Sequence, residues 1–171
     1  MFVRLAGSSD GEAIARVFAA VAEEGSIGTQ PPVDIEAHAA RFQEMLAAGE
    51  LVMAWVVEAD GRVVGYAGLY ESGPPGVVRF GMALLLEARG QGFGRALLEA
   101  ILEQARTHGA HKVELEVWPD NARAVALYAR AGFEVEGMRR DHYRRRDGSL
   151  RSTLLMACLL TDASGPAART G

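Results

Sequence analysis

The chain has 171 residues, 49% of them hydrophobic and 23% charged, which is the composition of a single globular domain. Its formal net charge of −4 argues against a nucleic-acid partner, because proteins that bind nucleic acid usually neutralise phosphates with a basic surface. The longest apolar run, Leu154 to Leu160, is too short to cross a bilayer, and no signal-peptide pattern precedes it, so we expect a cytoplasmic protein with no membrane partner.

Hydrophobic periodicity predicts the elements of the first half of the chain. In order, they are a strand at 2–5, a helix beginning at Ser9 or Asp10, a helix from Asp34 to Gly49, and strands at 51–57, 62–70 and 77–86. The dipeptide Asp60-Gly61 tolerates positive φ angles and therefore predicts a tight hairpin between the second and third strands.

The second half begins with a long amphipathic helix from about Gly92 to Gly109. A strand at 112–117, a helix from the capping Asn121 to Ala131, and two strands around an arginine-rich hairpin follow. The predicted order is βααβββαβαββ, an α/β domain over residues 1–160. Residues 161–171 lack periodicity and are expected to form a disordered tail.

A glycine-rich turn, Arg89-Gly90-Gln91-Gly92-Phe93-Gly94-Arg95, lies between a strand and the long helix. Free backbone N–H groups at a helix start attract phosphate oxygens, and glycines allow a close approach, so the turn predicts an anion site. A P-loop is excluded, because no Gly-Lys-Ser/Thr follows. The fingerprint G-x-G-x-x-G would need glycine at Arg95, but Glu114 or Glu116 lies where its ribose-binding acid belongs, so a dinucleotide site stays an alternative.

Two motifs together resemble the GNAT acetyltransferase superfamily. Arg89-x-x-Gly92-x-Gly94 is similar to its coenzyme A pyrophosphate motif, and Asn121-x-x-Ala124-x-x-Leu127-Tyr128, followed by Gly132-Phe133, is similar to its second signature. The resemblance implies a mixed, mostly antiparallel central sheet flanked by helices. It also implies acetyl-CoA as co-substrate, with its pantetheine arm between splayed strands at 77–86 and 112–117. The residues implied to bind it are Leu84 through its backbone amide, Arg89, Gly90, Gln91, Gly92, Phe93, Gly94, Arg95, Asn121 and Arg130.

The same resemblance implies two catalytic residues. Tyr128 is similar to the family tyrosine that returns a proton to the CoA thiolate, although helical spacing also allows it to be a core residue. Glu116 matches the general base of ribosomal-protein N-terminal alanine acetyltransferases. Alternatively, Glu114 and Glu116 simply alternate outward on a half-buried strand.

The acceptor is not determined by these motifs, because the chain resembles both ribosomal N-terminal acetyltransferases and small amino-acid or phosphinothricin-type acetyltransferases. The leading hypothesis is acetyl transfer to a primary amine of a small, amino-acid-like metabolite in a ternary complex. The alternatives are a protein N-terminus as acceptor, and a non-catalytic acyl-CoA-binding module. The hairpin side chains are interpreted either as a solvated turn or as a border of the acceptor site that favours carboxylates; they are Arg139, Arg140, His142, Tyr143, Arg144, Arg145 and Arg146.

No metal site is expected from the sequence. His108 and His111 have no third ligand nearby, and the single cysteine, Cys158, lies in an apolar run typical of a core strand. The oligomeric state stays open, with a homodimer among the options.

Overall fold

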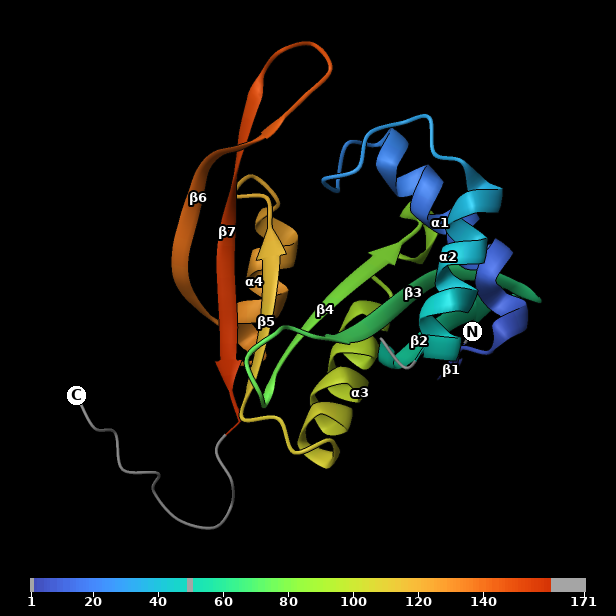
Figure 1. Ribbon diagram of the computed structural model, residues 1–171, viewed down its shortest axis with the longest axis horizontal. Helices are drawn as coiled ribbons and strands as arrows, with labels where there is room; N and C mark the ends of the chain where they lie inside the picture. The colour runs from blue at the N-terminus through green and yellow to red at the C-terminus, as the bar shows by residue number, and fades with distance from the viewer. Residues whose placement is uncertain (1, 49–50, 161–171) are drawn as a thin grey trace.

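The computed structural model describes residues 2–48 and 51–160 (Figure 1). Its strands are β1 (Phe2–Leu5), β2 (Leu51–Ala59), β3 (Arg62–Glu71), β4 (Val77–Leu84), β5 (Lys112–Val117), β6 (Glu134–Arg144) and β7 (Leu150–Leu159). Its helices are α1 (Gly11–Glu23), α2 (Ile35–Ala48), α3 (Phe93–Thr107) and α4 (Ala122–Arg130), with short 3-10 helices η1 (Ser8–Asp10) and η2 (Leu86–Ala88). The predicted order of strands and α-helices is confirmed, whereas the predicted tail, 161–171, lies outside the described residues.

The described strands form one sheet in the order β1-β2-β3-β4-β5-β7-β6. All neighbours pair antiparallel except β4 and β5, which are parallel. The mixed, mostly antiparallel sheet is therefore confirmed. Because β7 lies between β5 and β6, the hairpin at the end of the chain completes the sheet beside β5 (Figure 1).

The helices cover both faces of this sheet. Side chains alternate along β2, so that Trp55 and Val57 join the cluster that contains the buried face of α3, while Ala54 and Val56 pack with residues of α1 and α2. This two-sided burial explains the near-continuous apolar character of β2.

Two local sequence signals, a helix cap and a hairpin dipeptide, have the structures predicted for them. The Asp34 carboxylate accepts a hydrogen bond from the Ala37 N–H at 2.9 Å and caps α2. Asp60 and Gly61 have φ values of 50° and 72°, the left-handed pair that a tight hairpin requires.

The strand predicted at 51–57 is too short, since β2 extends to Ala59, and the strand predicted at 77–86 is too long, since β4 ends at Leu84. The Leu85 N–H still donates to the Val64 carbonyl of β3 at 2.9 Å, but the next residues form η2, where the Ala88 N–H donates back to the Leu85 carbonyl. Local bonds of this kind replace sheet pairing and turn the chain toward α3.

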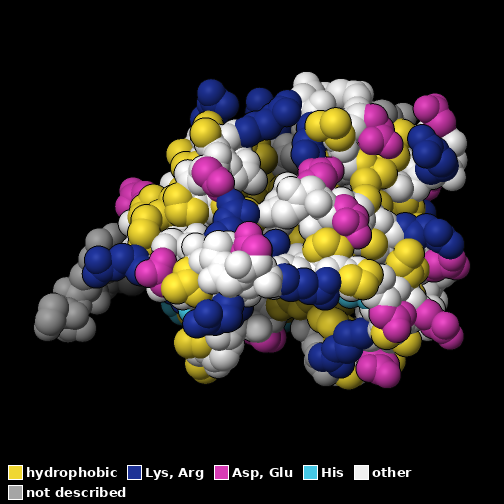
Figure 2. All heavy atoms as spheres, turned by 90° about the horizontal axis from the view of Figure 1, so that it is seen from above, with side chains coloured by type: hydrophobic (Ala, Val, Ile, Leu, Met, Phe, Trp, Pro, Cys, Tyr) yellow, Lys and Arg dark blue, Asp and Glu magenta, His cyan; other side chains and the backbone are white. Residues whose placement is uncertain are grey.

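Charged side chains of both signs are interspersed on the face seen in Figure 2, without a continuous basic area. Among the described residues, no helix combines the length and the apolar character that a membrane span requires.

Candidate active site

The parallel strands β4 and β5 diverge. They pair only where Val77, Val78 and Arg79 face Lys112, Val113 and Glu114, and no later pair joins them within the described residues. Figure 1 shows the two strands close together at one end and apart at the other. The splay that the resemblance implies is therefore present, and it leaves backbone groups along the gap without a sheet partner.

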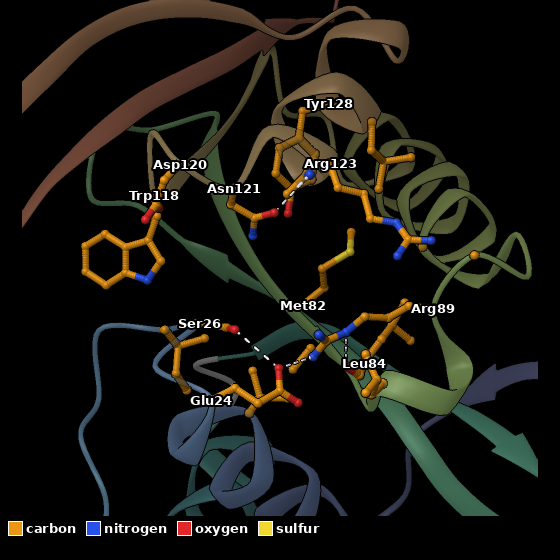
Figure 3. A pocket seen from close by; sticks show the side chains of 18 of the residues that line it. Glu24, Ser26, Met82, Leu84, Arg89, Trp118, Asp120, Asn121, Arg123 and Tyr128 are labelled. Carbon is orange, nitrogen blue, oxygen red and sulfur yellow. Dashed lines mark hydrogen bonds and ion pairs between the residues drawn. The ribbon is translucent and has the colours of Figure 1, made fainter.

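A cleft of about 720 Å³ lies at this gap. It is bordered by the end of α1 and the following loop, the end of β4, the glycine-rich turn and α4 (Figure 3). Of the residues expected to bind acetyl-CoA or to act on it, the cleft is lined by Leu84, Arg89, Gly90, Gly92, Gly94, Arg95, Asn121, Tyr128 and Arg130. Gln91 and Phe93 belong to the turn but are not among the lining residues.

The glycine-rich turn has the backbone shape that its sequence predicts. Gly90 and Gly92 have φ values of 80° and 89°, and Gly92 precedes the first turn of α3 without any side-chain cap. A Cβ at Gly94 would lie 3.2 Å from the Leu127 side chain, so glycine there lets α3 approach α4. The start of α3 thus offers uncapped N–H donors to an anion.

The arginines near the turn differ in their contacts. Arg89 donates to the Leu84 carbonyl at 2.9 Å and to Glu24 at 2.6 Å, so it braces the end of β4 against α1. Arg95 is mostly exposed and pairs with Glu99 on its own helix.

Arg123 is a cation that the sequence analysis missed. It lines the cleft from α4, and its Nη2 lies only 2.7 Å from the position that a Cβ at Gly90 would take. Its place two residues after the capping Asn121 was visible in the sequence, but nothing local indicated that it reaches the glycine-rich turn.

The backbone of β4 turns N–H donors toward the cleft. Because the Leu85 N–H donates to β3, alternation along the strand turns the N–H groups of Leu84 and Met82 away from β3 and toward β5. The Leu84 carbonyl on that side is occupied by Arg89. These N–H groups fit the amide carbonyls of a pantetheine arm or the oxygen of a thioester.

Asn121 is the N-cap of α4, and Tyr128 lies on this helix. The Asn121 Oδ1 accepts from the Ala124 N–H at 3.1 Å, which caps the helix as predicted. Tyr128 is 8% exposed, and its ring packs edge-to-face against Phe80 at 5.7 Å between centroids. Burial raises the pKa of Tyr128 to about 12, so the phenol keeps its proton at neutral pH. Figure 3 shows the hydroxyl directed into the cleft.

A second pocket of about 200 Å³ adjoins the cleft. The residues that line both are Ser26, Ile27, Met82, Trp118, Asn121 and Tyr128. Glu116 lines only the smaller pocket of these two, and its carboxylate is held at both oxygens: Arg139 donates to Oε1, and the Tyr143 hydroxyl donates to Oε2 at 3.1 Å. Burial and this neighbouring carboxylate raise the pKa of Tyr143.

A clasp, defined as the contacts between loop residues 25–30 and the β6–β7 hairpin with its flanking strand ends, lies beside this pocket. Arg145 donates to the Gly28 carbonyl at 2.9 Å. The Gln30 side chain donates to the Arg144 carbonyl at 3.2 Å and accepts from the Arg146 N–H at 2.7 Å. Arg151 donates to the Gly25 carbonyl at 3.0 Å.

The hairpin cluster of the sequence analysis is therefore divided by the fold. Tyr143 lines the smaller pocket, Arg139 pairs with Glu116, and Arg145 holds the loop. His142 and Arg140 are exposed and line neither pocket.

The family model for the GNAT acetyltransferase family matches residues 18–133. This chain belongs to the GNAT acetyltransferase family. The L-methionine sulfoximine/L-methionine sulfone acetyltransferase of Pseudomonas aeruginosa is 31% identical over 140 residues, covering 79% of this chain and 81% of that protein. The ribosomal protein bS18 alanine N-acetyltransferase of Escherichia coli is 30% identical over 119 residues, covering 68% and 80%. The structure of yncA from Salmonella typhimurium with its cofactor acetyl-CoA is 25% identical, with a TM-score of 0.82 and 98% of both chains covered.

As a GNAT acetyltransferase, the protein is an acetyl-CoA-dependent enzyme, and the cleft between β4 and α4 offers donors suited to that co-substrate. No three His, Cys, Asp or Glu side chains gather as a possible metal site in the part of the chain that the structure describes. Cys158 is buried on β7, as predicted for a core residue.

Proposed function

We propose that this GNAT acetyltransferase transfers the acetyl group of acetyl-CoA to a primary amine of a small, amino-acid-like metabolite. The observation that carries the proposal is the clasp, because its hydrogen bonds hold the loop that lines the smaller pocket with Ser26, Ile27 and Gly28 against the distant hairpin. A pocket of about 200 Å³ bounded in this way suits a free metabolite better than a peptide main chain. The similarity to an acetyltransferase of L-methionine sulfoximine supports the same choice.

Direct transfer in a ternary complex agrees with the geometry. The cleft and the smaller pocket meet at Tyr128 and Asn121, so a thioester in one and an amine in the other can react without an intermediate carried by the protein. Cys158 is buried and lines neither pocket, which argues against a thiol relay.

Glu116 is proposed as the general base. An amine attacks only when neutral, and at pH 7 deprotonation costs about 4 to 5 kcal/mol for a lysine-like amine and about 1 kcal/mol for an α-amine with a pKa near 8. Glu116 accepts this proton from the pocket wall, where Arg139 and Tyr143 fix both of its oxygens.

The remaining steps are assigned to the cleft. The amine nitrogen bonds to the thioester carbonyl carbon, and the Leu84 N–H stabilises the oxyanion that develops there. The C–S bond then breaks with its electron pair on sulfur, and Tyr128 donates a proton to the thiolate. The raised pKa of Tyr128, about 12, keeps this donor protonated at any pH near neutrality.

The glycine-rich turn and the start of α3 are proposed to hold the pyrophosphate, with Arg123 as an added cation. Arg89 acts as a brace for the Leu84 backbone in this proposal, because its guanidinium is already bonded to Leu84 and Glu24. Arg130, which lines the cleft, is proposed to lie near the adenosine phosphate, as the family resemblance implies.

Acetylation of a protein N-terminus is the second candidate. It is favoured by the similarity to the ribosomal protein alanine N-acetyltransferase, which acts on a protein. A peptide acceptor requires that the contacts of the clasp break, whereas a small acceptor is bound with these contacts intact. A cytoplasmic location, no nucleic-acid partner and a homodimer stay predictions.

The test measures release of the CoA thiol from acetyl-CoA with amino acids, polyamines or short peptides, beside direct CoA binding. We expect release that depends on a small amino acid or its analogue. Release with peptides alone would replace the proposal with the second candidate. CoA binding without turnover on any acceptor would contradict both candidates and favour a binding module.

A further inference from the structure

Trp118 follows β5 directly and stands at the junction of the two pockets. It is 6% exposed and lines both the cleft and the smaller pocket. In Figure 3 the nitrogen-bearing edge of the indole is turned toward the other labelled side chains, and the six-membered ring is turned away from them. The family motifs quoted from the sequence assign no role to this residue.

The indole Nε1 of Trp118 is buried without a hydrogen-bond partner. Across residues 2–48 and 51–160 it is the single buried side-chain nitrogen or oxygen in this condition. An indole N–H can only donate, and buried donors in native proteins are nearly always paired. The donor therefore lacks a protein partner at the place where a ligand oxygen could supply one.

The indole is held in place by its neighbours. Arg151 lies over its face with 4.4 Å from the guanidinium carbon to the ring centroid, and Tyr143 meets it edge-to-face at 5.0 Å. Arg151 is itself fixed by Asp120 at 2.7 Å and by the Gly25 carbonyl. Since the ring is clamped from two directions, the N–H direction is set before a ligand binds.

The same neighbours connect this donor to the proposed base. Tyr143 contacts the indole and donates to Glu116, and all three residues line the smaller pocket. If the acceptor amine lies near Glu116, a substituent on the carbon that carries this amine lies in the same small pocket. Because the indole N–H can only donate, it favours a ligand oxygen at this position. Among ligand oxygens, those of a carboxylate accept the strongest hydrogen bonds.

We propose that the Trp118 indole N–H donates to the α-carboxylate of the acceptor and so determines specificity for α-amino acids over simple amines. This inference rests on the proposed function and adds the recognition residue to it. A pantetheine carbonyl is the other possible oxygen, since Trp118 also lines the cleft, and the experiments distinguish the two.

The first experiment observes the indole N–H without turnover. The chain contains two tryptophans, so ¹⁵N-tryptophan labelling gives two indole signals, and Trp55→Phe assigns them. With CoA bound, L-methionine or L-phenylalanine should shift the Trp118 signal downfield and slow its exchange with solvent, while the corresponding decarboxylated amines should not. The Trp55 signal on β2 should stay unchanged. No shift with either amino acid, or a full shift with CoA alone, would overturn the proposal.

The second experiment compares kcat/KM for each amino acid and its decarboxylated amine in Trp118→Phe, with Trp55→Phe as the matched control. The ratio should fall roughly 10- to 100-fold in Trp118→Phe alone, as expected for a lost bond to a charged group, with the KM for acetyl-CoA unchanged. Equal losses for both acceptors would mean a packing role. If Trp118→Phe fails to fold, the NMR spectra of the wild-type protein in the first experiment test the proposal.

The wild-type enzyme separates this inference from the proposed function. If it acetylates amino acids and simple amines with equal efficiency, the proposed function as a small-amine acetyltransferase stands, but the proposed role of Trp118 is wrong. Acetylation of peptides alone would remove the proposed function itself.

Discussion

Tyr128 is the proposed proton donor to the CoA thiolate. Its ring is packed against Phe80, and its buried hydroxyl has a pKa raised to about 12. Tyr128→Phe keeps the packing and removes the donor, so we predict kcat lower by roughly 10- to 100-fold with little change in the Kd for CoA. Steady-state kinetics and calorimetry measure the two effects, and an unchanged kcat would exclude the proposed role.

The activity of Glu116→Gln should depend on pH. The variant lacks the proposed general base, so we predict the largest loss of kcat/KM at low pH and a smaller loss as pH approaches the pKa of the amine. A pH series from 6 to 9.5 on both enzymes measures this.

Glu114→Gln is the matched control for Glu116→Gln. Glu114 also points outward from β5, but it bonds to Ser72 and does not line the smaller pocket. It should retain near wild-type activity at every pH. A loss for Glu116→Gln that is the same at all pH values would indicate damage to the strand.

Arg123 is predicted to contribute to CoA affinity, because it reaches the glycine-rich turn across the cleft. Arg123→Ala should raise the Kd for CoA by about 10-fold, as expected for one lost contact to a charged phosphate, with kcat nearly unchanged. Arg95→Ala is the control, since Arg95 is largely exposed and pairs with Glu99. Equal effects of the two variants would mean that only general charge attraction operates.

The clasp joins the loop after α1 to the β6–β7 hairpin, two elements more than 100 residues apart in sequence. Arg145→Ala removes the bond to the Gly28 carbonyl, so we predict a KM for the small acceptor raised roughly 3- to 10-fold, an unchanged KM for acetyl-CoA, and a gain of activity on short peptides. Kinetics with both acceptor classes provide the measurement.

Arg144→Ala is the control for the clasp, because Arg144 contributes only its carbonyl to it. The variant should behave as wild type. If Arg145→Ala leaves both acceptor classes unaffected, the clasp does not control access to the pocket.

Buried tyrosines link the stability of the whole molecule to alkaline pH. Burial raises the pKa of Tyr66, Tyr70 and Tyr128 above the ordinary value of 10.0. Unfolded tyrosines lose their protons near pH 10 while the folded ones keep them, so the contribution of these tyrosines to the free energy of unfolding should be constant well below pH 10 and fall above it. Between pH 10 and 12 Tyr128 alone accounts for about 2 kcal/mol.

Urea unfolding at pH 8, 10 and 11 measures this decline. Tyr128→Phe should show a smaller fall between pH 10 and 11 than the wild type, because one of the titrating groups is gone. An identical pH dependence in both proteins would contradict the assignment of Tyr128 to this effect.

The sequence by itself determined the elements and the shape of the glycine-rich turn. Caps such as Asp34 and Asn121, the Asp60-Gly61 hairpin and the glycines before α3 depend on neighbours within a few positions, so their structures follow from local residue types. The family motifs placed Tyr128 and the glycine-rich turn for the same reason, since each lies in a short segment with a fixed relation to a helix end.

Only the tertiary structure decided how these segments meet. Nothing near Arg123 in the sequence indicates Gly90, and nothing near Glu116 indicates Arg139 and Tyr143. The end of β4 at Leu84, the clasp and the unpaired Trp118 nitrogen likewise depend on which strands and loops become neighbours. Contacts between distant segments arise from packing the whole sheet and its helices, and that packing is not encoded in any short stretch of residues.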